Sequence, residues 1–523
     1  MATKETSHHV EDEGLEKVVG TIGKDQDDAG AFIAQTGGVF EYSAKEANIV
    51  RWKLDLILLP MMTITYLLSF MDKVALGQAS IFGIMEGDVS FPAFLNREED
   101  IDTNVIQHLT GQEYSWASAI FYFGYLIAQY PCSILMQKMP IGKYFGVMIV
   151  LWGVATTCQA ATNSFATLAT CRFFLGAFET CISPVLTILV GQYWTRKEHP
   201  MRAVAWWAGA GIGGFVADGI TYSVSGGAWT HSKYSTWQLV FLVFGPISIA
   251  WGVFIFFAMP TSPMTAWFLT EREREIAVLR VIQNHTGIEN RRYKTYQARE
   301  ALLDPQVWML CANSFLQCIP GGGLTAFGKI VITGLGYSDR DAVIMSYPCD
   351  AVQLTSVVVS GVLAQAIPNI RIALMIVTNI IVLIGSVLVE ELPVSKTLGP
   401  MFILYVNTVP YIMCMSLVAS NIGGFTKKAT TGVMMFMSYS VGQIVAPHFF
   451  LASEKPRYPT GFRAFYISLA LMIVVEILMI VYLKIQNRKK EQAAAESAAS
   501  GVASSTDFMD LTDKEHPEFR YVF

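Results

Sequence analysis

Apolar runs of about 20 residues recur along this sequence, separated by short polar segments. At a rise of about 1.5 Å per residue, a helix of that length crosses the roughly 30 Å hydrocarbon core of a bilayer. The composition agrees, because 53% of the 523 residues are hydrophobic and only 15% are charged, whereas about a quarter of the residues in a soluble protein carry charge. The sequence therefore predicts an all-α membrane protein.

The apolar runs predict twelve transmembrane helices in two groups of six. The first group comprises residues 53–75, 114–136, 143–162, 165–192, 202–224 and 237–259. The second group comprises residues 306–334, 342–367, 371–390, 399–421, 429–451 and 463–486. Several runs contain proline, which lipid tolerates where neighbouring helices satisfy the freed backbone groups. We therefore expect two six-helix bundles.

This grouping divides the chain into five segments. We expect a disordered tail over 1–50, a six-helix bundle over 51–262, a linker with surface helices over 263–304, a second six-helix bundle over 305–487 and a disordered tail over 488–523. The two tails are too polar to bury a hydrophobic core.

The distribution of charged residues predicts the orientation in the membrane. Loops on the side of the N-terminus carry basic residues, namely Lys138, Lys143, Arg202, Arg371, Lys427, Lys428, Arg488, Lys489 and Lys490. The loop after the first span is acidic, with Glu86, Asp88, Glu98, Glu99, Asp100, Asp102 and Glu113 against the single Arg97. Because basic loops stay in the cytosol, both termini and the linker are predicted to be cytosolic.

Several classes of function are disfavoured by motifs that the sequence lacks. It has no GxxxxGK[ST] loop to hold ATP phosphates, no HExxH motif and no CxxC pair among its eight cysteines. It also has no basic patch with interleaved aromatic residues that would suggest nucleic-acid binding. We therefore predict no enzymatic activity, no cofactor, no metal and no nucleic-acid partner. Energy for transport would come from an ion gradient, the membrane potential or the substrate gradient.

One glycine pattern needs a separate interpretation. Gly209, Gly211 and Gly214 match the GxGxxG dinucleotide fingerprint, but that motif requires a preceding β-strand and a βαβ unit. Here the glycines lie inside a predicted membrane helix. The pair Gly209 and Gly213 instead predicts close packing against a neighbouring helix.

Four charged residues at membrane depth are the main candidates for function. Asp72 and Lys73 end the first span, and Arg172 and Glu179 lie in the fourth. A charge in lipid costs several kcal/mol unless it is paired or hydrated, so such residues usually mark a substrate or ion pathway. Arg172 and Glu179 are about two helical turns apart, on one face and too distant to pair with each other. If the first and fourth spans adjoin, two cations and two carboxylates share one pocket.

Such a pocket suits the coupling of an anion to protons, because cations hold a carboxylate and acids load and release protons. The alternative is that the four groups merely neutralise one another as interhelical ion pairs, with Asp72 and Lys73 reaching the membrane interface. Weaker candidates for transport, for which local packing is at least as good an explanation, are Asp218, Lys329, Asp350, Glu476 and His448.

The arrangement of six plus six spans around a basic linker resembles the major facilitator superfamily, whose halves are parallel repeats around a midplane site. Arg172 to Glu179 is similar to the RxxxGxxE signature of that superfamily's fourth helix, and Asp72-Lys73 is similar to the Asp-Arg pair of anion:cation symporters. More closely, residues 50–485 resemble the fungal allantoate permease family. The matching runs include YSWASAIFYFGYLIAQYP (114–131), IPGGGLTAFG (319–328), SNIGGFTKKA (420–429) and SEKPRYPTGF (453–462).

This resemblance implies a multi-pass permease, most simply in the plasma membrane, that takes up an organic anion such as a carboxylate, ureide or vitamin by proton symport. The residues implied for substrate binding are Lys73, Arg172, Gln129 and Gln443, and those implied for proton coupling are Asp72 and Glu179. The expected partners are the anion, protons and the lipid bilayer, with the protein acting as a monomer.

The chain departs from the family where members often carry asparagine. It has Ala75, Gly322, Ala326 and Gln443 at those positions. Loss of amide groups makes a cavity less polar, so we expect a substrate that is bulkier or more apolar than allantoate. Two other functions remain open from the sequence, namely export of a secondary metabolite by proton antiport and nutrient sensing without net transport.

Overall fold

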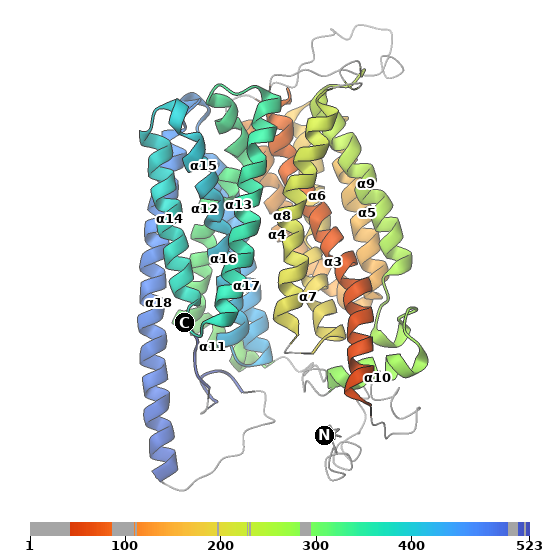
Figure 1. Ribbon diagram of the computed structural model, residues 1–523, viewed down its shortest axis with the longest axis vertical. Helices are drawn as coiled ribbons and strands as arrows, with labels where there is room; N and C mark the ends of the chain where they lie inside the picture. Colours follow the sequence, from red (N-terminus) through yellow and green to blue (C-terminus); the bar gives the residue numbers. More distant parts are fainter. Residues whose placement is uncertain are drawn as a thin grey trace, which may run out of the picture.

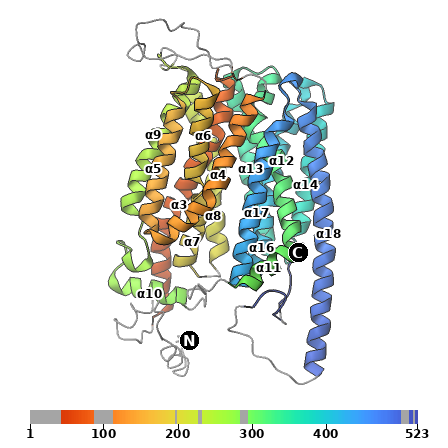
Figure 2. The same ribbon diagram turned by 180° about the vertical axis from the view of Figure 1, so that it is seen from behind.

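The computed structural model describes residues 42–85, 109, 112–195, 198–226, 229, 232–282, 294–499, 511–516 and 519–523. The acidic residues 86–102 of the first loop, whose charge entered the predicted orientation, lie outside this part of the chain. Two helical bundles stand side by side and are joined by a linker (Figures 1 and 2).

The first bundle, called the N half, is built from seven helical segments among the described residues. They are α3 (Ala44–Ile81), α4 (Glu113–Lys138), α5 (Ile141–Gln159), α6 (Phe165–Glu179), α7 (Ile182–Tyr193), α8 (His199–Val224) and α9 (Thr236–Ala258). The linker contains η2 (Pro263–Thr265), α10 (Glu271–Ile282) and α11 (Thr295–Leu303). Helix α10 packs against α3, and α11 packs against the second bundle.

The second bundle, called the C half, follows the linker. Its long helices are α12 (Pro305–Gly334), α13 (Asp339–Ala366), α14 (Arg371–Glu391), α16 (Thr408–Asn421), α17 (Phe425–Val445) and α18 (Pro459–Ala499). Short segments connect them, namely η3 (Val394–Lys396), α15 (Leu398–Leu404), η4 (Tyr405–Asn407), η5 (Ala446–Phe449) and η6 (Ala452–Glu454). The all-helical fold agrees with the prediction.

Eleven spans among the described residues are long and apolar enough to cross a membrane. The predicted run that is not among them corresponds to α17, which nevertheless packs in the bundle against α12 and α4. Helix α17 carries Lys427, Lys428 and several hydroxyl and amide side chains along its length. This polarity lowers its hydropathy, and burial among other helices makes the polarity tolerable.

Two predicted spans are interrupted. The fourth span is divided into α6 and α7 at Thr180–Cys181. The proline ring of Pro184 clashes with the carbonyl of the residue four positions earlier, Thr180, so the helix breaks there. In the same way, the predicted span 399–421 is divided into α15, η4 and α16, with Pro410 in the first turn of α16.

The predicted boundaries of both tails differ from the structure. Helix α3 begins at Ala44, inside the predicted tail, because Ser43 and Glu46 form a capping box at its N-terminus. Helix α18 continues to Ala499, and the described residues 511–516 and 519–523 lie against the C half. Thr512, Asp513 and Tyr521 are buried there. The prediction of a disordered tail from residue 488 is therefore wrong for these described residues, which obtain a core from the helices they contact.

Glycines permit the closest helix contacts. A Cβ atom on Gly209 would lie 2.5 Å from the Thr63 carbonyl oxygen, and one on Gly213 would lie 2.7 Å from that of Leu67. Both contacts join α8 to α3, as the glycine spacing predicted. The crossing of α4 and α6 is tighter, since a Cβ on Gly176 would lie only 1.9 Å from the carbonyl oxygen of Phe121.

The bundle has two ends, which we call proximal, where α3 begins, and distal, where α3 ends at Ile81. Linker helices α10 and α11 and the C-terminal residue lie at the proximal end (Figure 1). Contacts between the halves are prominent toward the distal end. The Tyr114 hydroxyl donates to the Ala326 carbonyl (2.6 Å) and the Ser115 hydroxyl donates to the Pro447 carbonyl (3.0 Å).

Candidate substrate site

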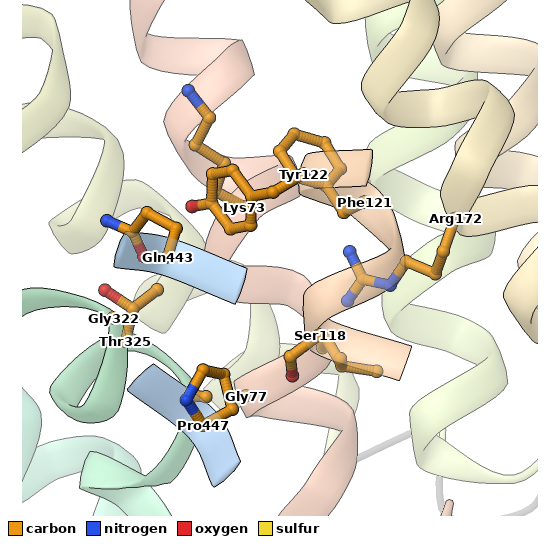
Figure 3. Close-up of a pocket in the computed structure, with 12 residues that line it drawn as sticks. Lys73, Gly77, Ser118, Phe121, Tyr122, Arg172, Gly322, Thr325, Gln443 and Pro447 are labelled. Carbon is orange, nitrogen blue, oxygen red and sulfur yellow. The ribbon is translucent and has the colours of Figure 1, made fainter. Parts of the chain in front are cut away.

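A small cavity lies between the halves, next to the distal contacts, since Ala326 and Pro447 also line it. Its volume is about 30 Å³, room for about two water molecules. The N half contributes Lys73, Leu76, Gly77, Ser118, Phe121, Tyr122 and Arg172, and the C half contributes Gly322, Thr325, Ala326, Gln443 and Pro447 (Figure 3). The halves must separate before an organic molecule can enter a space of this size.

Arg172 is the most exceptional residue of this cavity. Its side chain comes from the face of α6 that points into the N half, and the residue is only 3% exposed. Within the described residues no carboxylate forms an ion pair with it, and its buried Nε atom has no hydrogen-bond partner. A buried charge without a partner is costly, so a guanidinium that lines a cavity in this way is prepared to bind an anion.

Lys73 also lines the cavity, but it already has a partner. Its Nζ lies 3.0 Å from Oε1 of Glu179, whose side chain is completely buried. The hydroxyl of Ser69 donates to the same Oε1 at 2.5 Å, while Oε2 of Glu179 has no partner. The side chains of the first and fourth spans therefore meet here, and Glu179 holds Lys73 through an interhelical ion pair.

Asp72 faces the other way. Its Oδ2 accepts hydrogen bonds from Trp152 Nε1 on α5 and from the hydroxyl of Ser248 on α9 (3.3 Å), while its Oδ1 has no partner. Neighbouring residues on a helix are about 100° apart, so Lys73 can reach the cavity while Asp72 meets the interior of the N half. The four predicted charges are all buried or half-buried, but Asp72 does not line the cavity with the others.

The two predicted glutamines have different positions. Gln443 lines the cavity, where its Oε1 would lie 2.4 Å from a Cβ on Gly322, so the missing side chain of Gly322 makes room for this amide. Gln129 is half-buried on α4, seven residues beyond Tyr122, and is not among the lining residues. Its Oε1 is buried without a partner.

Sequence reasoning singled out the uncharged lining residues Gly322, Ala326 and Gln443 but missed the hydroxyl-bearing ones. Ser118 and Tyr122 lie one turn apart on α4, and Thr325 comes from α12. The available signal was their spacing on an otherwise apolar helix, together with the nearby glycines that allow α4 to approach α6. Such spacing indicates that this face of α4 packs against other helices, but it does not show whether the face lines a cavity or only contacts a neighbouring helix.

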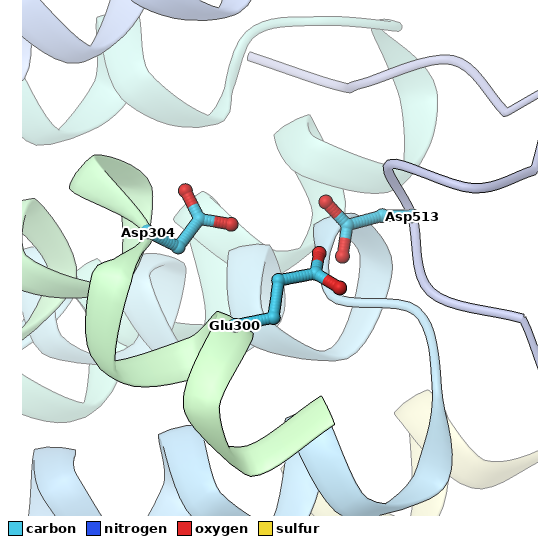
Figure 4. Close-up of side chains that lie close together, drawn as sticks. All are labelled: Glu300, Asp304 and Asp513. Atoms are coloured by element: carbon cyan, nitrogen blue, oxygen red, sulfur yellow. The ribbon is translucent and has the colours of Figure 1, made fainter. Parts of the chain in front are cut away.

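A second cluster of charges lies outside the cavity, at the proximal end. The carboxylates of Glu300, Asp304 and Asp513 converge there (Figure 4). The ammonium group of Lys427 is bonded to all three, at 2.9, 2.7 and 2.6 Å respectively. Because this cation already satisfies the acids, the cluster ties α11, α12 and α17 to the C-terminal segment, and a metal ion would have to displace the lysine.

The fold and the cavity together define the class of protein, which is a polytopic helical membrane transporter with a central site between two bundles. A family model described as Major Facilitator Superfamily matches residues 60–447. The chain belongs to that superfamily.

Similar proteins agree with this assignment. An uncharacterized transporter of Schizosaccharomyces pombe is 34% identical over 92% of this chain and 88% of its own length. The allantoate permease of Saccharomyces cerevisiae is 30% identical over 99% of this chain and 96% of its own. Among solved structures, the xylose transporter XylE of E. coli in a partially occluded inward open conformation has a TM-score of 0.55 at 14% identity, covering 81% of this chain and 97% of that one.

Proposed function

We propose that this transporter takes up a small organic anion together with protons. The observation that carries the proposal is Arg172, a buried guanidinium that lines the central cavity and has no ion-pair partner in the part of the chain that the structure describes. Guanidinium groups bind carboxylates through two parallel hydrogen bonds, and such charge-assisted bonds are about twice as strong as neutral ones. A relative described as an allantoate permease supports an anionic substrate.

The charge balance of the site supports coupling to protons. Lys73 and Arg172 supply two positive charges, and Asp72 and Glu179 supply two negative charges, so the four groups are neutral together. A bound monocarboxylate adds one negative charge to a low-dielectric interior, where an unbalanced charge is costly. Uptake of one proton by an acid of the site restores neutrality.

The ion pair between Lys73 and Glu179 provides a specific route for that coupling. Glu179 and the substrate carboxylate compete for the same ammonium group, because Oε1 of Glu179 lies 3.0 Å from Nζ of Lys73. Protonation of Glu179 removes its charge and frees Lys73 to face the substrate. Anion and proton then favour each other's binding, which is the reciprocity that symport requires.

The lining of the cavity favours an apolar body on the substrate. Beside the two cations and the hydroxyl and amide groups, the walls are formed by Leu76, Phe121, Tyr122, Ala326 and Pro447. An anionic group held at Arg172 would leave the rest of the molecule against aromatic and aliphatic surface. We therefore propose a carboxylate that is larger or more apolar than allantoate.

We also propose the plasma membrane as the site of action, with the proximal end in the cytosol as the basic residues predict, and a monomer as the functional unit. The distal contacts between Tyr114 and Ala326 and between Ser115 and Pro447 would then close the outer side. Import would proceed by rocking of one half against the other around the cavity.

The test uses purified protein in proteoliposomes and a panel of labelled carboxylates, ureides and vitamins. We expect uptake of an organic anion that rises when the outside is acidified and that dissipates an imposed pH gradient. Uptake of a neutral or cationic compound alone, or anion flux that is insensitive to the pH gradient, would overturn the proposal. Arg463→Lys is a suitable control variant, since Arg463 is exposed and pairs with Glu390 away from the cavity.

A further inference from the structure

A second set of buried charges joins the two halves near the distal end. Lys329 on α12 of the C half donates to Oδ1 of Asp218 on α8 of the N half, with an Nζ to Oδ1 distance of 2.7 Å. The side chains of Lys329 and Asp218 are only 13% and 3% exposed. Lys329 follows the cavity residue Ala326 by three residues, just under one helical turn toward the distal end, and neither Lys329 nor Asp218 lines the cavity.

A third charge, Asp350 on α13, faces the same surface of α8. A Cβ atom on Gly214 would lie 2.6 Å from Oδ1 of Asp350, so this carboxylate packs directly against the α8 backbone of the opposite half. Gly214 and Asp218 are four residues apart and share one face of α8. Likewise, Ser346, which accepts a hydrogen bond from Lys329 at 2.9 Å, lies four residues before Asp350. Asp218, Lys329 and Asp350 therefore form one cluster, which we call the distal cluster.

The distal cluster has one carboxylate more than it has cations. Asp218 and Asp350 are 2% and 8% exposed, and each has a buried Oδ2 atom without a hydrogen-bond partner. Gln78 on α3 donates its amide to Asp218 but brings no charge. With both acids ionised, the cluster would hold a net negative charge in a buried place, which is costly.

Neighbouring elements do not supply the missing positive charge. Among the described residues, the other titratable groups beside the cluster are Cys349 and Tyr347 on α13 and Tyr405 of η4, and a thiol or phenol of this kind carries no positive charge. Arg340 at the start of α13 stacks on the ring of Tyr222 at 4.4 Å. Arg340 and Tyr222 are exposed, so that cation is solvated at the rim.

We propose that the distal cluster binds one proton, shared between Asp218 and Asp350, whenever the two halves are closed at the distal end. The proton balances the two carboxylates against Lys329. Loss of the proton leaves an unpaired buried charge that is relieved when the halves separate and water enters. The site thus couples the opening of the distal end to deprotonation, and it does so independently of which substrate the central cavity carries.

The experiment measures the distance between the halves at the distal end as a function of pH. Spin labels are placed at Ser223→Cys on α8 and Ser395→Cys in η3, both exposed, in full-length protein whose Cys158 and Cys171 are replaced. In lipid nanodiscs without substrate, we expect short distances at low pH and a growing population of long distances as the pH rises.

Two neutralising variants test the assignment. Asp350→Asn and Asp218→Asn each leave one acid for Lys329, so either one should keep the distal end closed over the whole pH range. Lys329→Met leaves two acids without a cation, so its closing transition should move to lower pH by about one unit or more. Glu390→Gln, a carboxylate on α14 that pairs with Arg463, is the matched control and should titrate like the parent protein.

The proposal is overturned if both asparagine variants open with pH as the parent does, or if the parent shows no pH-dependent distance change. Because no substrate is present, these outcomes are distinct from failure of the proposed anion transport. If the parent protein opens as the pH rises but transports no anion, the proposal for the distal cluster is supported and the proposed anion transport is rejected.

Discussion

The Nζ atom of Lys73 lies 3.0 Å from Oε1 of Glu179, and this ion pair joins α3 to α6 at the edge of the central cavity. Arg172 lies on α6 two turns from Glu179 and has no such partner. The two cations of the site therefore differ, since Lys73 has a carboxylate partner and Arg172 has none among the described residues. Separate predictions therefore follow for Glu179 and for Arg172.

Glu179→Gln should uncouple transport from protons. Glutamine cannot lose a proton, so Lys73 would remain free at every pH and substrate binding would no longer release or take up a proton at this position. We expect exchange of internal for external substrate to continue, while accumulation driven by a pH gradient falls to background. Counterflow and gradient-driven uptake in the same proteoliposomes measure the two quantities. Retention of pH-driven accumulation would show that Glu179 is not the coupling acid.

Arg172→Lys should weaken binding even though the charge is kept. Lysine is a point charge and lacks the fork that makes two parallel hydrogen bonds to a carboxylate. Loss of one charge-assisted hydrogen bond, worth about 1.5–3 kcal/mol, corresponds to an increase in Kd of roughly 10-fold to 100-fold. Equilibrium binding of labelled substrate checks this value. An unchanged Kd would mean that the anion does not contact Arg172.

Gly176→Ala should destabilise the N half. The added Cβ would lie 1.9 Å from the Phe121 carbonyl oxygen, and that oxygen belongs to a helix backbone that cannot move away on its own. Overpacking of this kind costs about 1–3 kcal/mol. Thermal unfolding of the protein in detergent should therefore shift to lower temperature. Gly191→Ala on α7 is the control, because a Cβ there meets nothing within 4 Å.

Lys427→Met should release the C-terminal segment. The substitution leaves Glu300, Asp304 and Asp513 together without the cation that bonds to all three. Breaking a buried ion pair by removing one partner costs about 3–5 kcal/mol. We expect faster hydrogen exchange in residues 511–516 and a lower unfolding temperature. Lys428→Met, next to it on the exposed side of α17, should leave both measurements unchanged. Equal effects of the two variants would contradict the assignment.

The cluster of acids around Lys427 also predicts that the stability of the protein depends on pH. Burial of Asp304 tends to raise the pKa of its carboxyl, but the ammonium groups of Lys427 and Lys514 and the backbone N–H of Gln306 together lower that pKa overall. Because the pKa of Asp304 is lower in the folded protein than in the unfolded chain, its ionised carboxylate stabilises the folded protein. This contribution is complete above the unfolded-state pKa of about 4, and it is lost as the pH falls through the lower folded-state pKa. Acid unfolding below about pH 4 should therefore be less steep in Asp304→Asn than in the parent protein.

Much of the fold follows from local features of the sequence. Apolar runs of membrane length predicted the helices, the glycine pair Gly209 and Gly213 predicted close packing of their helix against a neighbour, and the spacing of Arg172 and Glu179 placed both residues inside the bundle. These predictions depend only on helix geometry and on the cost of polar groups in lipid, which act over a few residues at a time.

Other features depend on contacts between distant segments. The sequence could not decide that Lys73 pairs with Glu179 while Asp72 turns to Trp152, because adjacent residues on a helix face different neighbours. The sequence also could not predict that Asp218 pairs with Lys329, 111 residues away, or that Asp513 near the end of the chain pairs with Lys427.

The sequence by itself determined that the chain is a helical membrane protein and which charged residues lie at membrane depth, since hydrophobicity and periodicity are read along the chain. Only the tertiary structure decided which of those charges are paired, which one is left free in the cavity and which ones join the two halves. Pairing depends on how helices pack and rotate against one another, and that is set by the whole bundle rather than by any single span.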